Sequence, residues 1–282
     1  MISDKQTNTV YLSVGVRHYG RVRGSLLAGL SEQGIDVRFI PRTVSRKHVW
    51  ARDFMPIQLE KDKFLIYRYA PDYLNGYEDY IPPYREICKD LGLNCVCTDI
   101  VLDGGNVVKC GDKVIMTDKL LKENPGSSDN EILSELEKHF NAQIVLIPWD
   151  RYERFGHADG MVRWIDGDRV LMNDYCDIDP AFGERLRRVL SEHFIVEELS
   201  YGTREHEKVA WAYINFLHVG KTIFVPGLGI PDDDIAREQI SEFYHGYKVI
   251  RVEDCVGLVS YGGALNCATW TILSEANDSH SE

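Results

Sequence analysis

The stretch LDGGNVVKCGDKVIMTD, residues 102–118, contains the unit from which this fold is built. It begins with a polar motif, continues through an apolar segment, turns at Cys-Gly-Asp and ends in a second segment rich in strand formers. Gly and Asp between two such segments are typical of a tight hairpin. EILSELEKHF (131–140) follows, with its apolar residues on one face of a helix, and then QIVLIPW (143–149) as a further strand. We therefore predict a unit of strand, hairpin, strand, helix and strand.

The same unit recurs along the chain. Its second strand is predicted at five places, whose starts lie 49 to 56 residues apart: YLSVGV (11–16), FLIYRY (64–69), KVIMTD (113–118), RVLMND (169–174) and TIFVPG (222–227). Each is followed by an amphipathic helical stretch and another strand. A near-constant spacing of this length indicates a repeated supersecondary unit.

The two ends of the chain complete the repeat. Polar motifs stand before four of the five strands: WARD (50–53), LDGGN (102–106), HADG (157–160) and YINF (213–216). A fifth motif, YGGALNCATWTI (261–272), has no partner strand after it, and the strand at 11–16 has no motif before it. Pairing the two closes five units into a ring and protects the strand edges. We predict one α/β domain over residues 1–282, a five-bladed α/β propeller of pseudo-symmetric ββαβ units. An ordinary mixed α/β sandwich also fits the spacing alone.

The composition is that of an ordinary globular protein with an acidic balance. Of the 282 residues, 44% are hydrophobic and 27% charged, and the net charge is −12. This charge argues against nucleic acid or an anionic membrane as a partner and suits a small cationic ligand. Neither a signal peptide nor a membrane span is expected. Seven cysteines without a CxxC pair predict free thiols in a reducing cytoplasm and no metal site.

In a closed ring, the five polar motifs would occupy equivalent strands and converge on the axis. The distance to the following strand is 7 to 11 residues for Asp53, Asp103, Asp159 and Asn215. Cys267 lies in the fifth motif. Because buried carboxylates are costly unless they are paired with positive charge, their convergence predicts a site for a bound cation.

The motifs resemble, in order and over nearly the whole chain, those of the agmatine deiminases and bacterial Porphyromonas-type peptidylarginine deiminases. The matching segments are WARD (50–53), LDGGN (102–106), GHAD (156–159), YINF (213–216) and GGALNC (262–267). These proteins belong to the guanidino-group-modifying (pentein) superfamily, whose fold is a five-bladed α/β propeller. The chain departs from the family pattern at Asp103, where Glu is usual, at Asn266, where His is usual, and at Phe54-Met55-Pro56, where agmatine deiminases have Thr-Gly-Pro.

The resemblance implies a hydrolase without a cofactor that deiminates a guanidino compound, most plausibly agmatine, giving N-carbamoylputrescine and ammonia. Cys267 would attack the guanidinium carbon and form a covalent thiouronium, with His157 as general acid and then general base. Asp53 and Asp159 would hold the planar guanidinium by bidentate hydrogen bonds. Because side chains alternate along a strand, the H-x-D spacing is expected to place His157 and Asp159 on one face of a strand.

Other residues are expected around the substrate. Asn215, Gly262 and Gly263 would line the site and allow close approach. Asp103 would take part in substrate binding or serve only as a turn residue. Trp50 would either pack in the core or cover an aliphatic substrate arm.

Alternative functions remain open at this stage. They are a peptidylarginine deiminase, a free arginine deiminase or dihydrolase, an amidinotransferase, and an inactive propeller that binds guanidino ligands or a protein partner. Free arginine would need a basic group for its carboxylate, for which Arg163 and Arg204 are candidates. His206 and His218 are expected to be bystanders. A homodimer is compatible with the fold.

Overall fold

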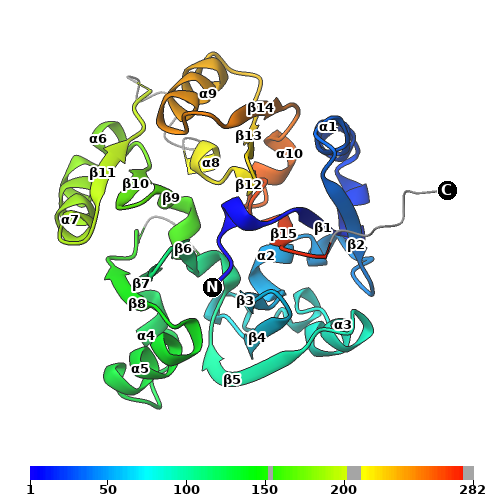
Figure 1. Ribbon diagram of the computed structural model, residues 1–282, viewed down its shortest axis with the longest axis vertical. Helices are drawn as coiled ribbons and strands as arrows, with labels where there is room; N and C mark the ends of the chain where they lie inside the picture. The colour runs from blue at the N-terminus through cyan, green and yellow to red at the C-terminus, as the bar shows by residue number, and fades with distance from the viewer. Residues whose placement is uncertain (152–154, 202–210, 276–282) are drawn as a thin grey trace.

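The computed structural model describes residues 1–151, 155–201 and 211–275. In this part of the chain, five three-stranded sheets stand around a central axis (Figure 1). The middle strand of each sheet pairs antiparallel with one neighbour and parallel with the other. The middle strands are β1 (Thr9–Ser13), β4 (Lys63–Arg68), β7 (Lys113–Thr117), β10 (Arg169–Met172) and β13 (Thr222–Pro226). They coincide with the five predicted repeats, and the predicted five-bladed α/β propeller is confirmed.

The strand nearest the axis pairs antiparallel with the middle strand of each sheet (Figure 1), and in four of the five described sheets the two strands form a hairpin. These inner strands are β3 (Ile57–Glu60), β6 (Val108–Cys110), β9 (Val162–Asp166), β12 (Leu217–Val219) and β15 (Thr269–Ile272). Gly111 and Gly167, in the predicted Cys-Gly-Asp and Asp-Gly-Asp turns, have φ of 72° and 44°. Positive φ in a two-residue hairpin loop favours glycine, so the local sequence sets the register of these hairpins.

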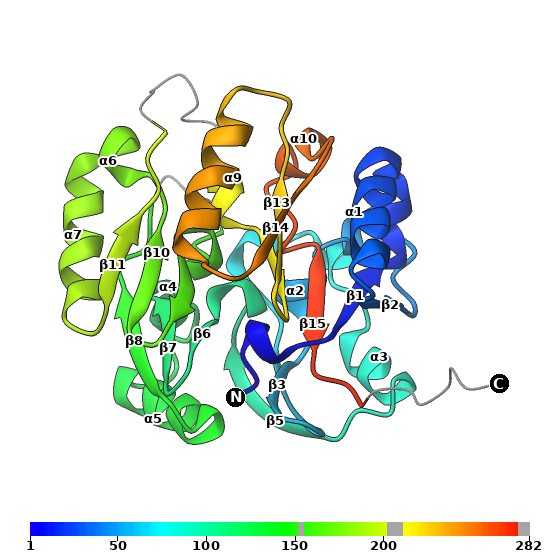
Figure 2. The same ribbon diagram turned by 45° about the horizontal axis from the view of Figure 1, so that its top comes forward.

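Helices cover the outer rim of the ring, as Figures 1 and 2 show. The main helices are α1 (Gly20–Glu32), α3 (Tyr84–Asp90), α5 (Asp129–Phe140), α7 (Pro180–Ser191) and α9 (Asp232–Phe243). Each leads into the outer strand of its sheet: β2 (Asp36–Ile40), β5 (Cys95–Val101), β8 (Gln143–Ile147), β11 (Ile195–Glu198) and β14 (Lys248–Val252). In α5, Ile132, Leu136 and Phe140 are buried, and Ser128 with Glu131 forms a capping box. The predicted helical face is therefore the face that packs on the sheet.

The ring closes through the two ends of the chain. β1 pairs antiparallel with β15, with Thr9 opposite Ile272 and Leu12 opposite Thr269, and Figure 2 shows the two strands side by side. Trp270 of β15 donates a hydrogen bond from Nε1 to the carbonyl of Pro56 (2.8 Å). This hydrogen bond ties the closing sheet to the next blade. The pairing of β1 with β15 is the closure that the unpartnered first strand and the unpartnered last motif predicted.

The five polar motifs form short helical turns directly before the inner strands, and the prediction that they are strands is wrong. Four of the turns are α2 (Ala51–Phe54), η6 (Gly104–Asn106), η7 (Ala158–Gly160) and α8 (Trp211–Ile214). His157 precedes η7 with extended φ and ψ, and Asp159 lies inside it, so the two do not alternate on a strand. Gly, Asp and Asn are depleted in strands and favoured in turns, which explains the difference.

The remaining elements are short. They are η1 (Asp4–Gln6), η2 (Val14–His18), η3 (Arg46–His48), η4 (Asp72–Leu74), η5 (Glu78–Tyr80), α4 (Lys119–Glu123), α6 (Tyr175–Ile178) and α10 (Val256–Val259). Within the three described ranges, every helix falls short of the length and apolar character needed to cross a membrane.

Candidate active site

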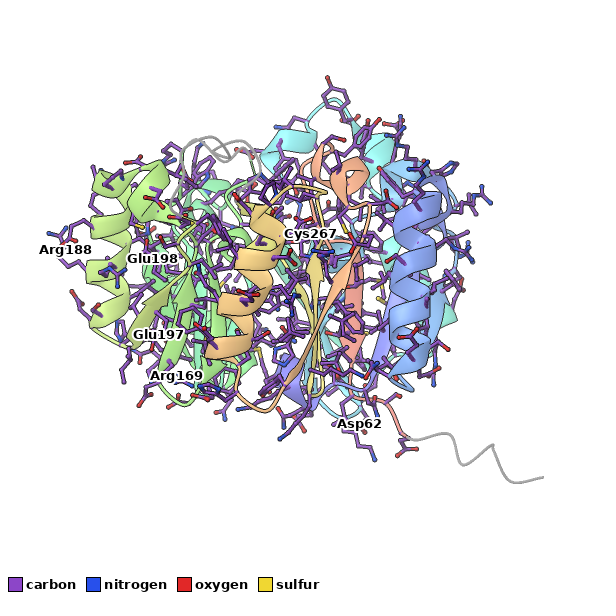
Figure 3. The ribbon with its side chains drawn as sticks, turned by 90° about the horizontal axis from the view of Figure 1, so that it is seen from above. Asp62, Arg169, Arg188, Glu197, Glu198 and Cys267 are labelled. Atoms are coloured by element: carbon purple, nitrogen blue, oxygen red, sulfur yellow. The ribbon has the colours of Figure 1, made fainter. Side chains whose placement is uncertain are left out.

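A cavity of about 330 Å³ opens where the helical turns before the inner strands meet. Asp53, His157 and Cys267 contribute to its wall, together with Trp50 and Gly262. Figure 3 shows Cys267 in the interior of the molecule. The cavity therefore collects side chains from motifs that lie more than 200 residues apart in the sequence.

Cys267 lies against a carboxylate. Its Sγ is 3.7 Å from Oδ2 of Asp159, and the same oxygen accepts a hydrogen bond from Nδ2 of Asn266 (2.6 Å). Burial and the negative charges of Asp159 and Asp53 raise the pKa of the Cys267 thiol well above its ordinary value. The protein alone thus keeps this thiol protonated, and a cation bound in the cavity would favour the thiolate.

His157 is held between two carboxylates. Its Nε2 is 2.7 Å from Oδ2 of Asp103, and its Nδ1 is 3.7 Å from Oδ1 of Asp53. Burial lowers the pKa of His157, but the charge of Asp53 and the hydrogen bond with Asp103 outweigh it and raise the pKa to about 10. The ring is therefore an imidazolium at neutral pH, ready to give up a proton.

Asp53 presents an unsatisfied oxygen. The residue is 5% exposed and lines the cavity, and Oδ1 has no hydrogen-bond partner among the described residues. Burial raises the pKa of Asp53 to about 7, although the imidazolium of His157 opposes the rise. A buried acceptor without a donor is costly, so a cationic ligand with N–H groups would be stabilised here.

Asp103 lies behind His157 rather than on the cavity wall. Besides the histidine, its Oδ2 accepts a hydrogen bond from the hydroxyl of Tyr73 (3.2 Å) and is 4.0 Å from Nζ of Lys119. Lys119 is fully buried and also pairs with Glu123 (3.0 Å). Asp103 is therefore more than a turn residue. Sequence reasoning missed Tyr73 and Lys119, since neither belongs to a motif.

Asn215 also lies behind the wall, where it holds the Cys267 segment. Its Oδ1 accepts hydrogen bonds from the backbone amides of Ala264 and Cys267 (both 3.2 Å). Asn106 performs the same task one motif away: its Oδ1 accepts from the amide of Ala158, next to His157 (3.3 Å). Sequence reasoning missed Asn106. The available signal was the matching place of Asn106 and Asn215, each two residues before an inner strand.

Trp50 packs in the core, which is one of the two roles that the sequence left open, and its cover of a substrate arm stays a prediction. Its side chain packs on the hydrophobic core and also lines the cavity. The ring lies over Gly263, where a Cβ would come within 2.1 Å of it. Gly262 lines the cavity, while Gly263 supports the wall from behind. A close approach of this kind requires glycine.

Arg163, one of the two candidates for holding the carboxylate of free arginine, does not line the cavity. It is 4% exposed, and its Nη2 donates to Oδ2 of Asp4 (3.0 Å). His218 is likewise buried elsewhere, bonded to the carbonyl of Gly220 (3.1 Å). Arg204 and His206 lie outside the described residues.

The outer part of the cavity is aromatic. Its described wall includes Phe54, Tyr69, Tyr73, Tyr77, Tyr80, Phe155 and Tyr261. Lys47 also lines it and forms an ion pair with Asp79. The cavity thus combines a charged inner end with an aromatic passage that suits the apolar arm of a substrate.

This chain is similar in sequence and in fold to proteins that are named agmatine deiminases. A protein of Streptococcus mutans provisionally named agmatine deiminase is 27% identical over 86% of this chain and 78% of its own length. A similarly named protein of Listeria monocytogenes is 25% identical over 61% of this chain and 57% of its own. The solved agmatine deiminase of Enterococcus faecalis superposes with a TM-score of 0.79 at 19% identity, covering 98% of this chain and 96% of that one.

A family model supplies the broadest match and confirms the resemblance read from the motifs. The model of the Porphyromonas-type peptidyl-arginine deiminases matches residues 2–272. This range contains all five polar motifs and all three strands of the closing sheet. The chain belongs to the Porphyromonas-type peptidyl-arginine deiminase family.

Proposed function

We propose that this chain is a hydrolase that deiminates a guanidino compound through a covalent intermediate on Cys267. The observation that carries the proposal is the grouping of a thiol, an imidazolium and an unsatisfied carboxylate on one cavity wall. Membership of a family of deiminases supports it. The carboxylates at the inner end of the cavity suit a planar cation.

Binding uses the carboxylates. The free Oδ1 of Asp53 accepts N–H groups from the guanidinium fork, and Asp159, beside the sulfur, provides a second anionic oxygen. The bound cation offsets the negative charges that keep the thiol protonated. Substrate binding and thiolate formation are therefore coupled, and the nucleophile is activated when its target is present.

The chemical steps balance without an added reagent. The Cys267 thiolate forms a bond to the guanidinium carbon, and the imidazolium of His157 gives its proton to the departing nitrogen, so that the C–N bond breaks and ammonia leaves. The product of this half-reaction is a thiouronium. Neutral His157 then removes a proton from water, whose oxygen attacks the same carbon. The C–S bond breaks and the hydroxyl proton of the intermediate passes to the departing sulfur, which releases a neutral ureido product and restores the thiol. The proton that the thiol lost on substrate binding leaves with ammonia as ammonium.

Positioning residues keep the reacting groups in place. Asp103 and Tyr73 hold one side of the imidazole, and Asn215 fixes the backbone on both sides of the nucleophile. Because the contacts of His157 and Asn215 are buried and that of Tyr73 is partly buried, the site is formed before substrate arrives.

Agmatine is the substrate that we propose first, because the named relatives are agmatine deiminases. Free arginine and peptidyl arginine are the other candidates. Lys47 at the cavity wall favours a tail that bears a carboxylate, whereas the ring faces of Tyr77 and Tyr80 accept an alkyl or ammonium tail.

Ammonia release tests the proposal. Agmatine, arginine and an N-blocked arginine ester would be supplied to the wild type, to Cys267→Ala and to Cys97→Ala, whose thiol is exposed on β5. We expect release with the wild type and Cys97→Ala and none with Cys267→Ala. Mass spectrometry of quenched wild-type enzyme should show an adduct on Cys267. Release from none of the three compounds would favour a guanidino-binding propeller, and release from the blocked ester alone would favour a peptidylarginine deiminase.

The cellular compartment, the metabolic role and the oligomeric state remain predictions from the sequence. All seven cysteines are free thiols, which suits a reducing cytoplasm. A role in putrescine formation depends on agmatine being the substrate. A homodimer stays a prediction.

A further inference from the structure

A second, smaller cavity lies near the axis on the other side of the motif turns. Its volume is about 20 Å³, enough for one particle of about the size of water. Its wall includes Asp4, Lys5, Arg52, Lys109, Arg163, Trp164, His218 and Asn266. It therefore lies beneath the Cys267 segment, between the inner strands and η1.

The repeat of the fold gathers basic residues at this point. Lys109, Arg163 and His218 are each the second residue of an inner strand, in three successive blades. Equivalent positions in a ring point at the same place on the axis. Arg52, from the turn before β3, completes the group.

The positive side chains in the described wall of this cavity outnumber the negative ones. Arg52 is 8% and Arg163 4% exposed, and the Lys109 side chain is 9% exposed. Asp4 is the acidic residue of the described wall, 3.0 Å from Arg163 and 3.6 Å from Lys109. With half-buried Lys5 included, the described wall holds four cationic side chains and one carboxylate. Unpaired buried charge is costly, so the cavity is suited to a negative particle.

Arg52 is the least satisfied of these groups. A guanidinium carries five N–H donors. Among the described residues, the side chain of Arg52 makes two long hydrogen bonds, to the Asn266 carbonyl (3.4 Å) and to the Thr271 hydroxyl (3.5 Å). Donors therefore remain available for a ligand in the cavity.

The titration of the neighbours agrees with a positive potential. Burial lowers the pKa of Lys109, and Arg52 and Arg163 lower it further against the pull of Asp4. Burial lowers the pKa of His218 to about 4, with Arg163 contributing, so its ring is neutral near pH 7. The same cations hold the pKa of Asp4 below its ordinary value, so it is ionised.

We propose that this cavity is a binding site for one small inorganic anion of the size of chloride. The small volume favours a monatomic anion over a larger oxyanion or a carboxylic acid. The guanidinium groups of Arg52 and Arg163 and the ammonium of Lys109 supply the donors. One water is the competing occupant, because Oδ1 of Asp4 and Oδ1 of Asn266 are acceptors without a hydrogen-bond partner among the described residues.

The site connects directly to the nucleophile. The backbone amide of Arg52 donates to the carbonyl of Cys267 (3.0 Å), and Arg52 precedes Asp53 in the chain. Asn266, in the cavity wall, bonds to Asp159. An anion that orders Arg52 would therefore stiffen the segments that carry the thiol and both carboxylates.

The first test uses wild-type crystals soaked in sodium bromide, with data collected at the bromine edge. We expect an anomalous peak inside the cavity, in contact with Arg52. Ordinary water density there with no anomalous signal would overturn the proposal. This test depends neither on a variant nor on the deiminase activity.

The second test compares melting temperatures in sodium chloride and sodium gluconate at equal ionic strength. At an anion concentration ten times its dissociation constant, we expect chloride to raise the melting temperature by about 3 °C. Lys109→Met should lose this difference, and Lys63→Met, the same change on the surface of β4, should keep it. Equal melting temperatures of the wild type in the two salts would contradict an anion site. If Lys109→Met does not fold, the bromide map decides.

Discussion

The Sγ of Cys267 lies 3.7 Å from the Oδ2 of Asp159, an oxygen that Asn266 also holds by a hydrogen bond of 2.6 Å. A nucleophile and an anion in contact oppose each other, because the carboxylate disfavours the thiolate. The arrangement becomes productive when a cation lies between them. In the proposed mechanism, the carboxylate that would bind the guanidinium also keeps the thiol unreactive until the guanidinium arrives.

Asp159→Asn should make the resting thiol more reactive while it weakens turnover. Removal of the negative charge lowers the pKa of Cys267, and we expect the midpoint of alkylation by iodoacetamide against pH to move down by about one unit. Cys267→Ala gives the background from the other thiols. An unchanged midpoint would show that burial alone sets the pKa of this thiol.

The protonation of His157 should make stability depend on pH. Its pKa is about 10 in the folded protein, against 6.5 ordinarily. Since the folded state binds the proton more tightly, this stabilisation is complete below about pH 6.5 and is lost as the pH rises through about 10. Between pH 7 and 10, the wild type should therefore lose more of its unfolding free energy than His157→Asn does. Urea unfolding at several pH values measures this difference, and parallel curves for the two proteins would refute it.

Asn215 should affect turnover only by holding the Cys267 segment in position. Asn215→Ala leaves the buried amides of Ala264 and Cys267 without their acceptor, which costs about 2 kcal/mol. We expect a lower denaturation midpoint and a fall in kcat with little change in KM. Asn215→Asp, which keeps an acceptor oxygen, should recover part of both.

The control for this prediction is Asn106→Ala. It removes an equivalent acceptor beneath Ala158, beside His157, and among the described residues Asn106 has no hydrogen bond to the Cys267 segment. The Asn106 variant should therefore change the pH dependence of turnover more than the alkylation of Cys267. If the two variants behave alike in both measurements, the asparagines support the fold in general and no particular reacting group.

The ring could be predicted from the sequence because its signals are local. Hairpin glycines and apolar strands recur within each unit, and an unpartnered element at each end indicates closure. The helical turns were missed because strand alternation was assumed for HADG (157–160), a segment whose Gly and Asp favour turns.

Only the site residues that belong to the motifs could be predicted from the sequence. Asp53, His157 and Cys267 reach one cavity because each motif occupies the same place in its unit. Lys119 and Tyr73 reach Asp103 from the short helices α4 and η4, whose positions depend on packing between blades. The spacing of residues along the sequence does not predict where such residues lie in the fold. Arg163 belongs to the strand after its motif, which directs it into the second cavity.

Lys47 should influence which substrate tail is accepted. It lines the outer cavity and pairs with Asp79, in a wall where the other described charged residues, Asp53 and His157, lie at the inner end. Lys47→Met removes a charge that attracts a carboxylate and repels an ammonium. We expect KM for arginine to rise and KM for agmatine to fall, each by up to about fivefold, as for other exposed ion pairs. Lys63→Met, on the outside of β4, should change neither value. A parallel change of KM for both substrates would mean that Lys47 acts on the shape of the entrance through Asp79, whereas opposite changes identify its charge as the selecting feature.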